Sequence, residues 1–250
     1  MPDPYVHVTP STFDALAGGE QAPLSPEDDH HVRRVLRLGV GADLVLSDGR
    51  GREAPARLTA EGVVLTGDVV VVQERSPRLH VVQALAKSRK VDEVIRSVTE
   101  LGVSAVTVVA ADRSVVALSG PKTRKVQDRW HSIARSAAGQ SRRAHLPEVQ
   151  GPVSVEEVAA GVGDRVVGLV AEVAARTGLR TALMGAGRVA DPHEVRIAIG
   201  PEGGWSDDEL AVFDGAGWVA VTLSSSSVLR TEHAGLVASA GIAALMGWMD

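Results

Sequence analysis

The strongest constraint on the fold is an alternation of apolar runs and helical patterns that begins near residue 79. Residues 79–85 and 103–110 have the length and composition of buried strands, and apolar residues at helical spacing separate them over 91–101. The same rhythm predicts a helix over 121–138, strands over 165–170, 195–199 and 218–223, and a last helix over 231–248. Alternating strands and helices predict an α/β domain with a mostly parallel sheet covered on both faces.

The first 75 residues follow a different pattern. Short runs rich in β-forming residues are separated by turn signals, and they predict strands over 5–8, 43–47, 54–58 and 63–72. Ser25 and Pro26 are the N-cap and first residue of one expected helix. The polar, proline-containing stretch 73–78 marks a boundary between a small β-barrel over 1–74 and the α/β domain over 75–250.

Composition excludes several classes of protein. The chain has no cysteine, which excludes disulfide scaffolds, zinc sites with thiolate ligands and cysteine nucleophiles. Its eight histidines form no ligand pattern for a metal, so no metal is expected. No apolar stretch approaches the roughly 20 residues of a membrane span, and the first residues lack the features of a signal peptide. We therefore expect a cytoplasmic protein without a membrane partner.

The net charge of −5 conceals a strongly basic middle third. Residues 76–150 carry 13 Lys and Arg against 6 Asp and Glu, whereas residues 1–75 carry 7 against 12 and residues 151–250 carry 6 against 13. A basic segment in an acidic protein is typical of a polyanionic partner such as nucleic acid. A solvated helix face paired with acidic neighbours is the alternative interpretation.

Two polar loops follow expected strands near the C-terminus. The first, Gly200-Pro201-Glu202-Gly203-Gly204, runs from a buried strand to a helix start at which Ser206 and Glu209 form a capping box. Ligands in open α/β sheets bind beyond the carboxyl ends of the strands, where this loop lies. Its glycines either allow backbone N–H groups to approach a ligand or only form a tight turn.

The second loop, residues 224–230, precedes the last helix, for which Thr231 is the expected N-cap. Arg230 and Glu232 flank that position. The loop is either a serine linker before a capped helix or part of a site with the first loop. Two such loops on successive strands favour a shared site.

GPEGG after a strand, followed by Leu229-Arg-Thr-Glu232 at the head of the last helix, resembles the small-subunit ribosomal RNA uracil-N3 methyltransferases of the RsmE type, which belong to the SPOUT class. The segments around 31–38, 90–103 and 130–140 resemble other parts of the family, so the resemblance covers the whole chain. It implies a PUA-like β-barrel followed by a SPOUT-type α/β domain with a C-terminal deep trefoil knot. It also implies a homodimer, the cofactor S-adenosylmethionine (SAM), and 16S ribosomal RNA in the small ribosomal subunit as substrate, with methylation at a uridine near position 1498.

The resemblance also implies roles for individual residues. Arg230 would stabilise charge on the uracil oxygens, and Glu232 would either accept the N3 proton or orient Arg230. The residues expected to bind the cofactor are Leu169, Val170, Ala171, Glu172, Ile199, Gly200, Pro201, Glu202, Gly203, Gly204, Leu223, Ser224, Ser226, Val228 and Leu229. The basic residues expected to bind RNA are Arg33, Arg34, Arg37, Lys87, Arg89, Lys90, Arg113, Arg135, Arg142 and Arg143, with Lys122, Arg124, Lys125 and Arg129 as further phosphate contacts.

The chain departs from the family pattern in three places, the first being Asp3-Pro4-Tyr5, where some relatives carry an arginine. Four serines, Ser224–Ser227, stand where the family often has glycine and other residues, and they could crowd the cofactor. His233 places a titratable group beside Arg230 and Glu232. Two alternatives therefore stay open: a SPOUT methyltransferase acting on another RNA nucleotide, and a non-catalytic RNA-binding or ribosome-assembly protein with the same fold.

Overall fold

The computed structural model describes residues 2–87, 89–115, 120–185, 192–224 and 226–248. The chain divides into two compact units. The N-terminal unit comprises residues 1–74 and 135–146, and the C-terminal unit comprises residues 75–134 and 147–250.

The N-terminal unit is a mixed β-sheet with short helices. Its strands are β1 (Tyr5–His7), β2 (Asp43–Ser47), β3 (Arg52–Leu58), β4 (Val63–Leu65) and β5 (Val70–Val71). They follow the order β1-β2-β3-β4, with β5 also paired to β3. Its helices are α1 (Pro10–Ala17) and α2 (Pro26–His30), the latter continued by a π-helical turn over His31–Val35. Ser25 caps α2 as the sequence predicts, whereas α1, capped by Thr9, was not predicted.

Residues 135–146 make their contacts within the N-terminal unit, although the sequence places them in the second domain. The guanidinium of Arg135 pairs with Asp28, and the backbone N–H of Gly51 donates to the carbonyl of Ala144 over 3.0 Å. These long-range contacts cannot be predicted from the helical periodicity of the segment, which is the same throughout its helix.

His7 is a buried histidine that makes the stability of the N-terminal unit depend on pH. Its Nε2–H donates to the carbonyl of Arg143 over 2.8 Å, and burial lowers its pKa to about 4. Between pH 4 and its ordinary pKa near 6.5 the unfolded chain therefore binds a proton that the folded chain does not.

Lowering the pH from 7 to 5 should reduce the free energy of unfolding of the natural protein by about 2 kcal/mol more than that of His7→Gln. Glutamine keeps an N–H donor but does not titrate. Urea unfolding at both pH values measures the difference. Equal losses in the two proteins would exclude His7 as the cause.

The C-terminal unit is built on a six-stranded sheet in which every pair of neighbouring strands is parallel. The strands, in the order β11-β9-β10-β6-β7-β8, are β6 (Arg78–Ala84), β7 (Ala105–Val109), β8 (Glu148–Val153), β9 (Val166–Ala171), β10 (Glu194–Ile199) and β11 (Val219–Val221). The helices are α3 (Lys90–Leu101), α4 (Pro121–Gln140), α5 (Val155–Ala159), α6 (Leu179–Gly185), α7 (Asp207–Gly215) and α8 (Thr231–Leu245). The prediction of a parallel sheet is confirmed, while β8, α5 and α6 were not predicted.

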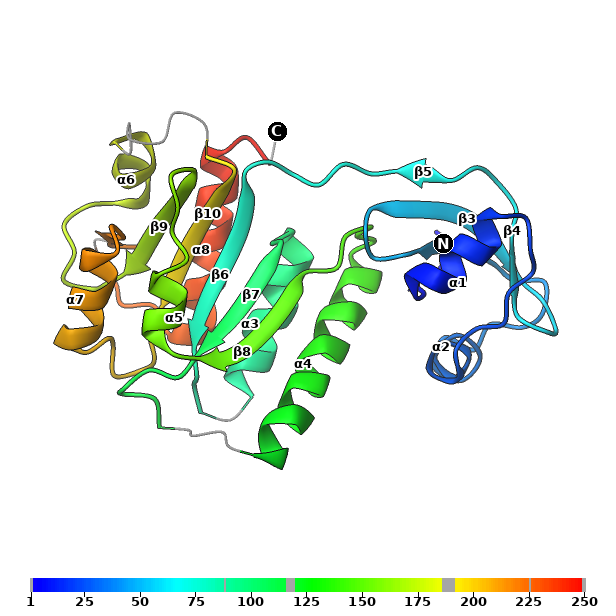
Figure 1. Ribbon diagram of the computed structural model, residues 1–250, viewed down its shortest axis with the longest axis horizontal. Helices are drawn as coiled ribbons and strands as arrows, with labels where there is room; N and C mark the ends of the chain where they lie inside the picture. The colour runs from blue at the N-terminus through cyan, green and yellow to red at the C-terminus, as the bar shows by residue number, and fades with distance from the viewer. Residues whose placement is uncertain (1, 88, 116–119, 186–191, 225, 249–250) are drawn as a thin grey trace. The chain divides into compact units, whose positions relative to one another are not determined.

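Helices cover both faces of this sheet, as Figure 1 shows. Side chains of α3, α6 and α8 pack with one face, and those of α5 and α7 pack with the other. Strand residues alternate between the two cores, so Val81 joins the first and Val82 the second. This double burial explains why the strands are continuous apolar runs in the sequence.

The segment after β11 leads from the edge of the sheet back toward its central strands. It leaves the edge strand, and the N–H of Thr222 donates to the carbonyl of Thr177 over 2.8 Å. It then enters α8, which packs on α3, β6 and β10. These contacts favour the knotted path that the resemblance implies, and the knot itself stays a prediction. Among the described residues, no helix is long and apolar enough to cross a membrane.

Candidate active site

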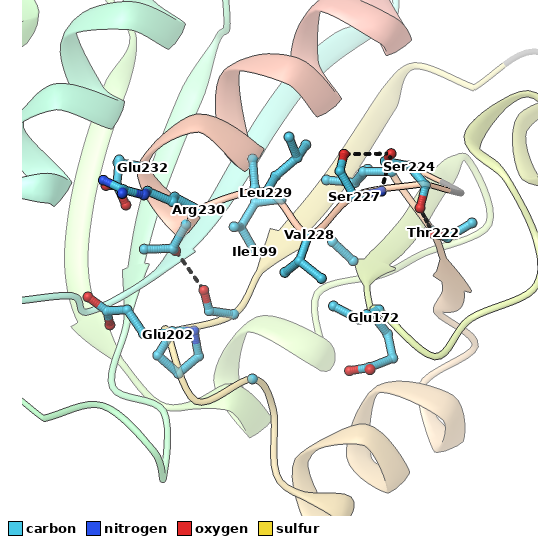
Figure 2. A pocket seen from close by; sticks show the side chains of 18 of the residues that line it. Glu172, Ile199, Glu202, Thr222, Ser224, Ser227, Val228, Leu229, Arg230 and Glu232 are labelled. Atoms are coloured by element: carbon cyan, nitrogen blue, oxygen red, sulfur yellow. Dashed lines mark hydrogen bonds between the residues drawn. The ribbon is translucent and has the colours of Figure 1, made fainter.

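A pocket of about 520 Å³ lies beyond the carboxyl ends of β9 and β10. Its volume falls in the range of roughly 300–1,000 Å³ that is typical of small-molecule sites. The two polar loops of the sequence analysis form much of its wall: residues of both 200–204 and 222–230 line it. In Figure 2, Glu202, Arg230 and Glu232 lie at one end of the pocket, and Thr222, Ser224 and Ser227 lie at the other.

The first loop, residues 200–204, contains a glycine turn. Gly204 has a φ of +71°, and its N–H donates to the carbonyl of Pro201 over 2.9 Å. Ser206 then caps α7 through the predicted capping box with Glu209. The carboxylate of Glu209 also accepts the N–H of Asp112 over 2.9 Å, which fixes the loop to the segment after β7.

The serines of the second loop bond mainly to one another. The hydroxyl of Ser224 accepts the N–H groups of Ser226 and Ser227 over 3.3 and 3.2 Å, and lies 3.0 Å from the hydroxyl of Ser227. Thr222 donates to the carbonyl of Ser224 over 2.9 Å. Ser225 lies outside the described residues. Ser224, Ser226 and Ser227 thus form a self-bonded turn in which the hydroxyls of Ser224 and Ser227 are engaged.

A hydrogen-bonded chain joins the two loops to the central strand β6. Gln83, which is fully buried, donates from Nε2 to the hydroxyl of Thr231 over 3.0 Å. Thr231 in turn donates to the carbonyl of Gly200 over 2.7 Å. Thr231 is the first residue of α8, and the N-cap position belongs to Arg230. The expectation that Thr231 is the N-cap is therefore wrong.

Arg230 and Glu232 lie on the pocket but differ in exposure. Arg230 has extended backbone at the N-cap and an exposed side chain, whereas the side chain of Glu232 is only 8% exposed. Hydrogen bonding to its own backbone N–H, together with Lys90, holds the pKa of Glu232 below its ordinary value against the effect of burial. An ionised carboxylate and an exposed guanidinium thus face the same end of the pocket.

Lys90, the first residue of α3, also lies on the pocket. Its Nζ is 3.1 Å from a carboxylate oxygen of Glu202 and 3.1 Å from one of Glu232. These two carboxylates raise the pKa of Lys90. Burial raises the pKa of Glu202, but its own backbone N–H and Lys90 outweigh this effect, and the net pKa is lowered.

Most of the residues expected to bind a cofactor line the pocket. They are Ala171, Glu172, Ile199, Gly200, Pro201, Glu202, Gly204, Leu223, Ser224, Val228 and Leu229.

Four of the expected residues do not line it. Leu169 and Val170 are buried in the two cores, because β9 is covered on both faces and only its carboxyl end reaches the pocket. Gly203 lies against Arg113, whose guanidinium donates to the Gly203 carbonyl over 3.1 Å. Ser226 lies on the exposed side of the serine turn.

Apart from Arg230 and Glu232, six lining residues are not among those named above as cofactor ligands, although one of them, Ser227, belongs to the second polar loop, which was expected to form part of the site. They are Val173, Thr222, Ser227, Thr231 and Ala234, together with Lys90, which was expected to bind RNA. One sequence signal was available for the hydrogen bonds behind the pocket: Gln83 is a polar residue within an apolar run that predicts a buried strand.

The basic residues expected to bind RNA fall into two groups. Several make internal contacts: Arg33 with Asp29, Arg129 with Asp92, Arg135 with Asp28, Arg142 with the Asp3 carbonyl, Arg113 with the Gly203 carbonyl and Arg143 with the His7 side chain through its carbonyl. Others have exposed side chains, namely Arg34, Arg37, Lys87, Arg89, Lys122, Arg124 and Lys125.

Within the described residues, no group of three or more His, Asp or Glu side chains is placed to hold a metal ion.

The chain matches two domain families. A model described as an RNA methyltransferase domain matches residues 73–243, and one described as an RNA methyltransferase PUA domain matches residues 24–62. The fold, the pocket and these matches define the chain as an RNA methyltransferase domain preceded by a PUA-like β domain.

Individual relatives narrow this class. Ribosomal RNA small subunit methyltransferase E from Mycobacterium bovis is 35% identical, with 98% of this chain and 92% of that protein covered. The protein of the same name from Bacillus subtilis is 29% identical, with coverage of 89% and 91%. The chain belongs to the ribosomal RNA small subunit methyltransferase E family, which confirms the resemblance drawn from GPEGG and LRTE.

Solved structures agree with this placement. A putative methyltransferase from Legionella pneumophila, solved with the bound cofactor SAM, is 28% identical with a TM-score of 0.83, and the match covers 98% of both chains. Ribosomal RNA small subunit methyltransferase E from Neisseria gonorrhoeae, solved with SAM bound, is 26% identical with a TM-score of 0.83 and the same coverage.

Proposed function

We propose that this protein transfers a methyl group from SAM to N3 of a uridine in 16S ribosomal RNA of the small ribosomal subunit. The observation that carries the proposal is the pocket of about 520 Å³ that brings both family motifs, GPEGG and LRTE, together beyond the sheet. Membership of the family supports the substrate, and the pocket supports the cofactor. Because the substrate is ribosomal, we expect the protein to act in the cytoplasm.

The residues present fit SAM. The pocket combines apolar walls from Ile199, Val228 and Leu229 with backbone groups of both loops. Glu172 and Glu202 add carboxylates that suit the positive charges of the cofactor and its ribose hydroxyls. The hydroxyls of Ser224 and Ser227 bond to each other, which supports room for the cofactor beside this turn. Bound SAM would supply an electrophilic methyl group on a sulfonium sulfur.

The residues of this chain have two tasks in the reaction. Uracil N3 carries a proton and becomes a good nucleophile only when that proton leaves, which places negative charge on the flanking oxygens. Arg230 is exposed at the mouth of the pocket, where its guanidinium can stabilise that charge. Glu232 is held ionised and can accept the N3 proton. Holding the base in line with the methyl group would supply much of the remaining rate.

The target base has to leave its stack to enter this pocket. The exposed cations, including Lys87, Arg89 and Lys122, would hold the flanking phosphates.

If about six of the basic residues bind phosphates, RNA affinity should fall with salt at a log–log slope near −4 to −5. Fluorescence anisotropy with a small-subunit RNA fragment, measured between about 50 and 200 mM salt, gives the slope. A slope near zero would contradict the basic surface.

We also propose that the protein acts as a homodimer. Leu236 and Val237 project from α8 with 37% and 42% of their surface exposed. Apolar residues on a helix of small residues suit close packing against a second copy.

Methyl transfer from labelled SAM to small subunits that lack the modification tests the proposed function. Variants of the pocket, described below, separate cofactor binding from chemistry.

A further inference from the structure

Helix α3 begins with two cations, and Asp92 and Glu93 follow them in the same first turn. Its first residue is Lys90, and its N-cap is Arg89, which makes no side-chain capping bond. The positive end of the helix dipole lies at this terminus and disfavours positive side chains. Asp92 and Glu93 satisfy this preference for negative charge, whereas the charge of Lys90 gains nothing from the helix itself.

The ammonium group of Lys90 is placed between two acidic residues from separate parts of the chain. Its Nζ lies 3.1 Å from Oε1 of Glu202, in the loop after β10, and 3.1 Å from Oε2 of Glu232, in the first turn of α8. The side chains of Lys90, Glu202 and Glu232 are 28%, 34% and 8% exposed. Lys90 therefore lies within the pocket end that also carries Arg230.

The two carboxylates need this cation. Both are held by the same ammonium, so removing it would leave two like charges close together with one of them largely buried. Such a pair separates or takes up a proton, because like charges disfavour each other's ionised forms. Either response would move Glu232 or neutralise it.

We propose that Lys90 is a positioning residue for methyl transfer, which holds Glu202 of the cofactor loop against Glu232 of the catalytic helix. This inference rests on the proposed function. It replaces the expectation from the sequence that Lys90 binds an RNA phosphate.

The charge arrangement predicts how Glu232 titrates. The charged groups around it are Lys90 from α3, Glu202 from the loop after β10, His233 from its own helix and Arg230 at the N-cap of that helix. Lys90 is one cause of the lowered pKa of Glu232, so its removal raises that pKa. The carboxylate would then become protonated at a higher pH, and the acid limb of the kcat profile would move upward.

The test compares Lys90→Met, which keeps an unbranched stem without charge, with Lys90→Arg, which restores the charge. Arg96→Met is the matched control, because Arg96 is an exposed cation of the same helix that does not line the pocket. We expect Lys90→Met to lower kcat about tenfold or more and to move the acid limb up by about one pH unit. RNA affinity and its salt slope should stay within twofold, and Lys90→Arg should recover most of kcat.

A loss of RNA affinity in Lys90→Met with a smaller salt slope and unchanged kcat would make Lys90 a phosphate contact and overturn the inference. Unchanged kcat and an unchanged pH profile would overturn it as well.

A second measurement separates this inference from the proposed function. The carboxyl carbon of Glu232, assigned through Glu232→Gln, can be titrated by NMR in the protein without RNA. A higher pKa of Glu232 in Lys90→Met supports the positioning role of Lys90 even if the natural protein methylates no small-subunit RNA. An unchanged pKa of Glu232 contradicts that role even if the enzyme is active.

Discussion

Arg230→Ala is expected to lower kcat for methyl transfer by about 10²–10³-fold while the Kd for SAM changes less than threefold. The magnitude is that of losing one donor that stabilises developing oxyanion charge. Arg230 is exposed at the N-cap of α8, so its truncation removes no packing from the core. Single-turnover kinetics with saturating RNA and SAM measure the chemical step, and calorimetry measures SAM binding.

Arg96→Ala is the control for Arg230→Ala, since it removes an exposed arginine outside the pocket. It should leave kcat and the Kd for SAM unchanged. Arg230→Lys keeps the charge but not the planar donor pair and should fall between the natural protein and Arg230→Ala. A normal kcat in Arg230→Ala would contradict the role of Arg230 in charge stabilisation, and a lost SAM signal would make it a cofactor ligand.

Gly204→Val is expected to weaken SAM binding by about tenfold or more. Gly204 has a φ of +71° and lines the pocket. A β-branched residue is strained by about 1–2 kcal/mol in this left-handed region, so the loop after β10 should leave its observed conformation. A loss of about 1.4 kcal/mol corresponds to tenfold in Kd. Calorimetric titration with SAM measures the effect.

Gly217→Val provides the matched control. Gly217 has a φ of +81°, and like Gly204 it closes a turn through its N–H and has no neighbour within 4 Å of an added Cβ. It lies between α7 and β11, away from the pocket lining. Both variants should lose similar unfolding free energy, while only Gly204→Val loses SAM affinity. Equal SAM affinities in the two variants would contradict a cofactor role for the loop 200–204.

Elements with strong periodicity could be predicted from the sequence. The predicted bounds 91–101 and 195–199 agree with α3 and β10 to within one residue. The pattern is strong because α3 packs one face on an apolar core and β10 lies between two such cores. The segments that were missed, such as α5 and α6, are 5 and 7 residues long, too short for a helical repeat of apolar residues to stand out. The division of α4 between the two units depends on tertiary contacts of Arg135 that no local pattern records.

The two loops of the site could be predicted from the sequence, but the side-chain contacts that join them could not. GPEGG and LRTE follow strands, and the carboxyl ends of parallel strands meet at one edge, so their proximity could be inferred. Lys90 was grouped with RNA contacts because charge density along the chain carries no information about partners in space. Its two glutamates come from positions 112 and 142 residues further along the chain, since 202 − 90 is 112 and 232 − 90 is 142.

The N-cap of α8 was assigned to Thr231 instead of Arg230 for a similar reason. The residue type of Thr231 and its place before a helix are typical of an N-cap. The structure uses its hydroxyl instead between Gln83 and Gly200, since a buried amide that lacks an acceptor costs more than an uncapped helix end. Such a choice depends on what lies behind the loop, which the sequence of the loop does not contain.

The central claim is tested most directly by methyl transfer from labelled SAM to small ribosomal subunits lacking the modification, followed by mass spectrometry of the nucleosides. The account predicts N3-methyluridine in 16S ribosomal RNA with the natural protein, formed about 10²–10³-fold more slowly with Arg230→Ala. Label in a different nucleotide would contradict the proposed substrate. Absence of label together with absence of SAM binding would contradict the proposed activity.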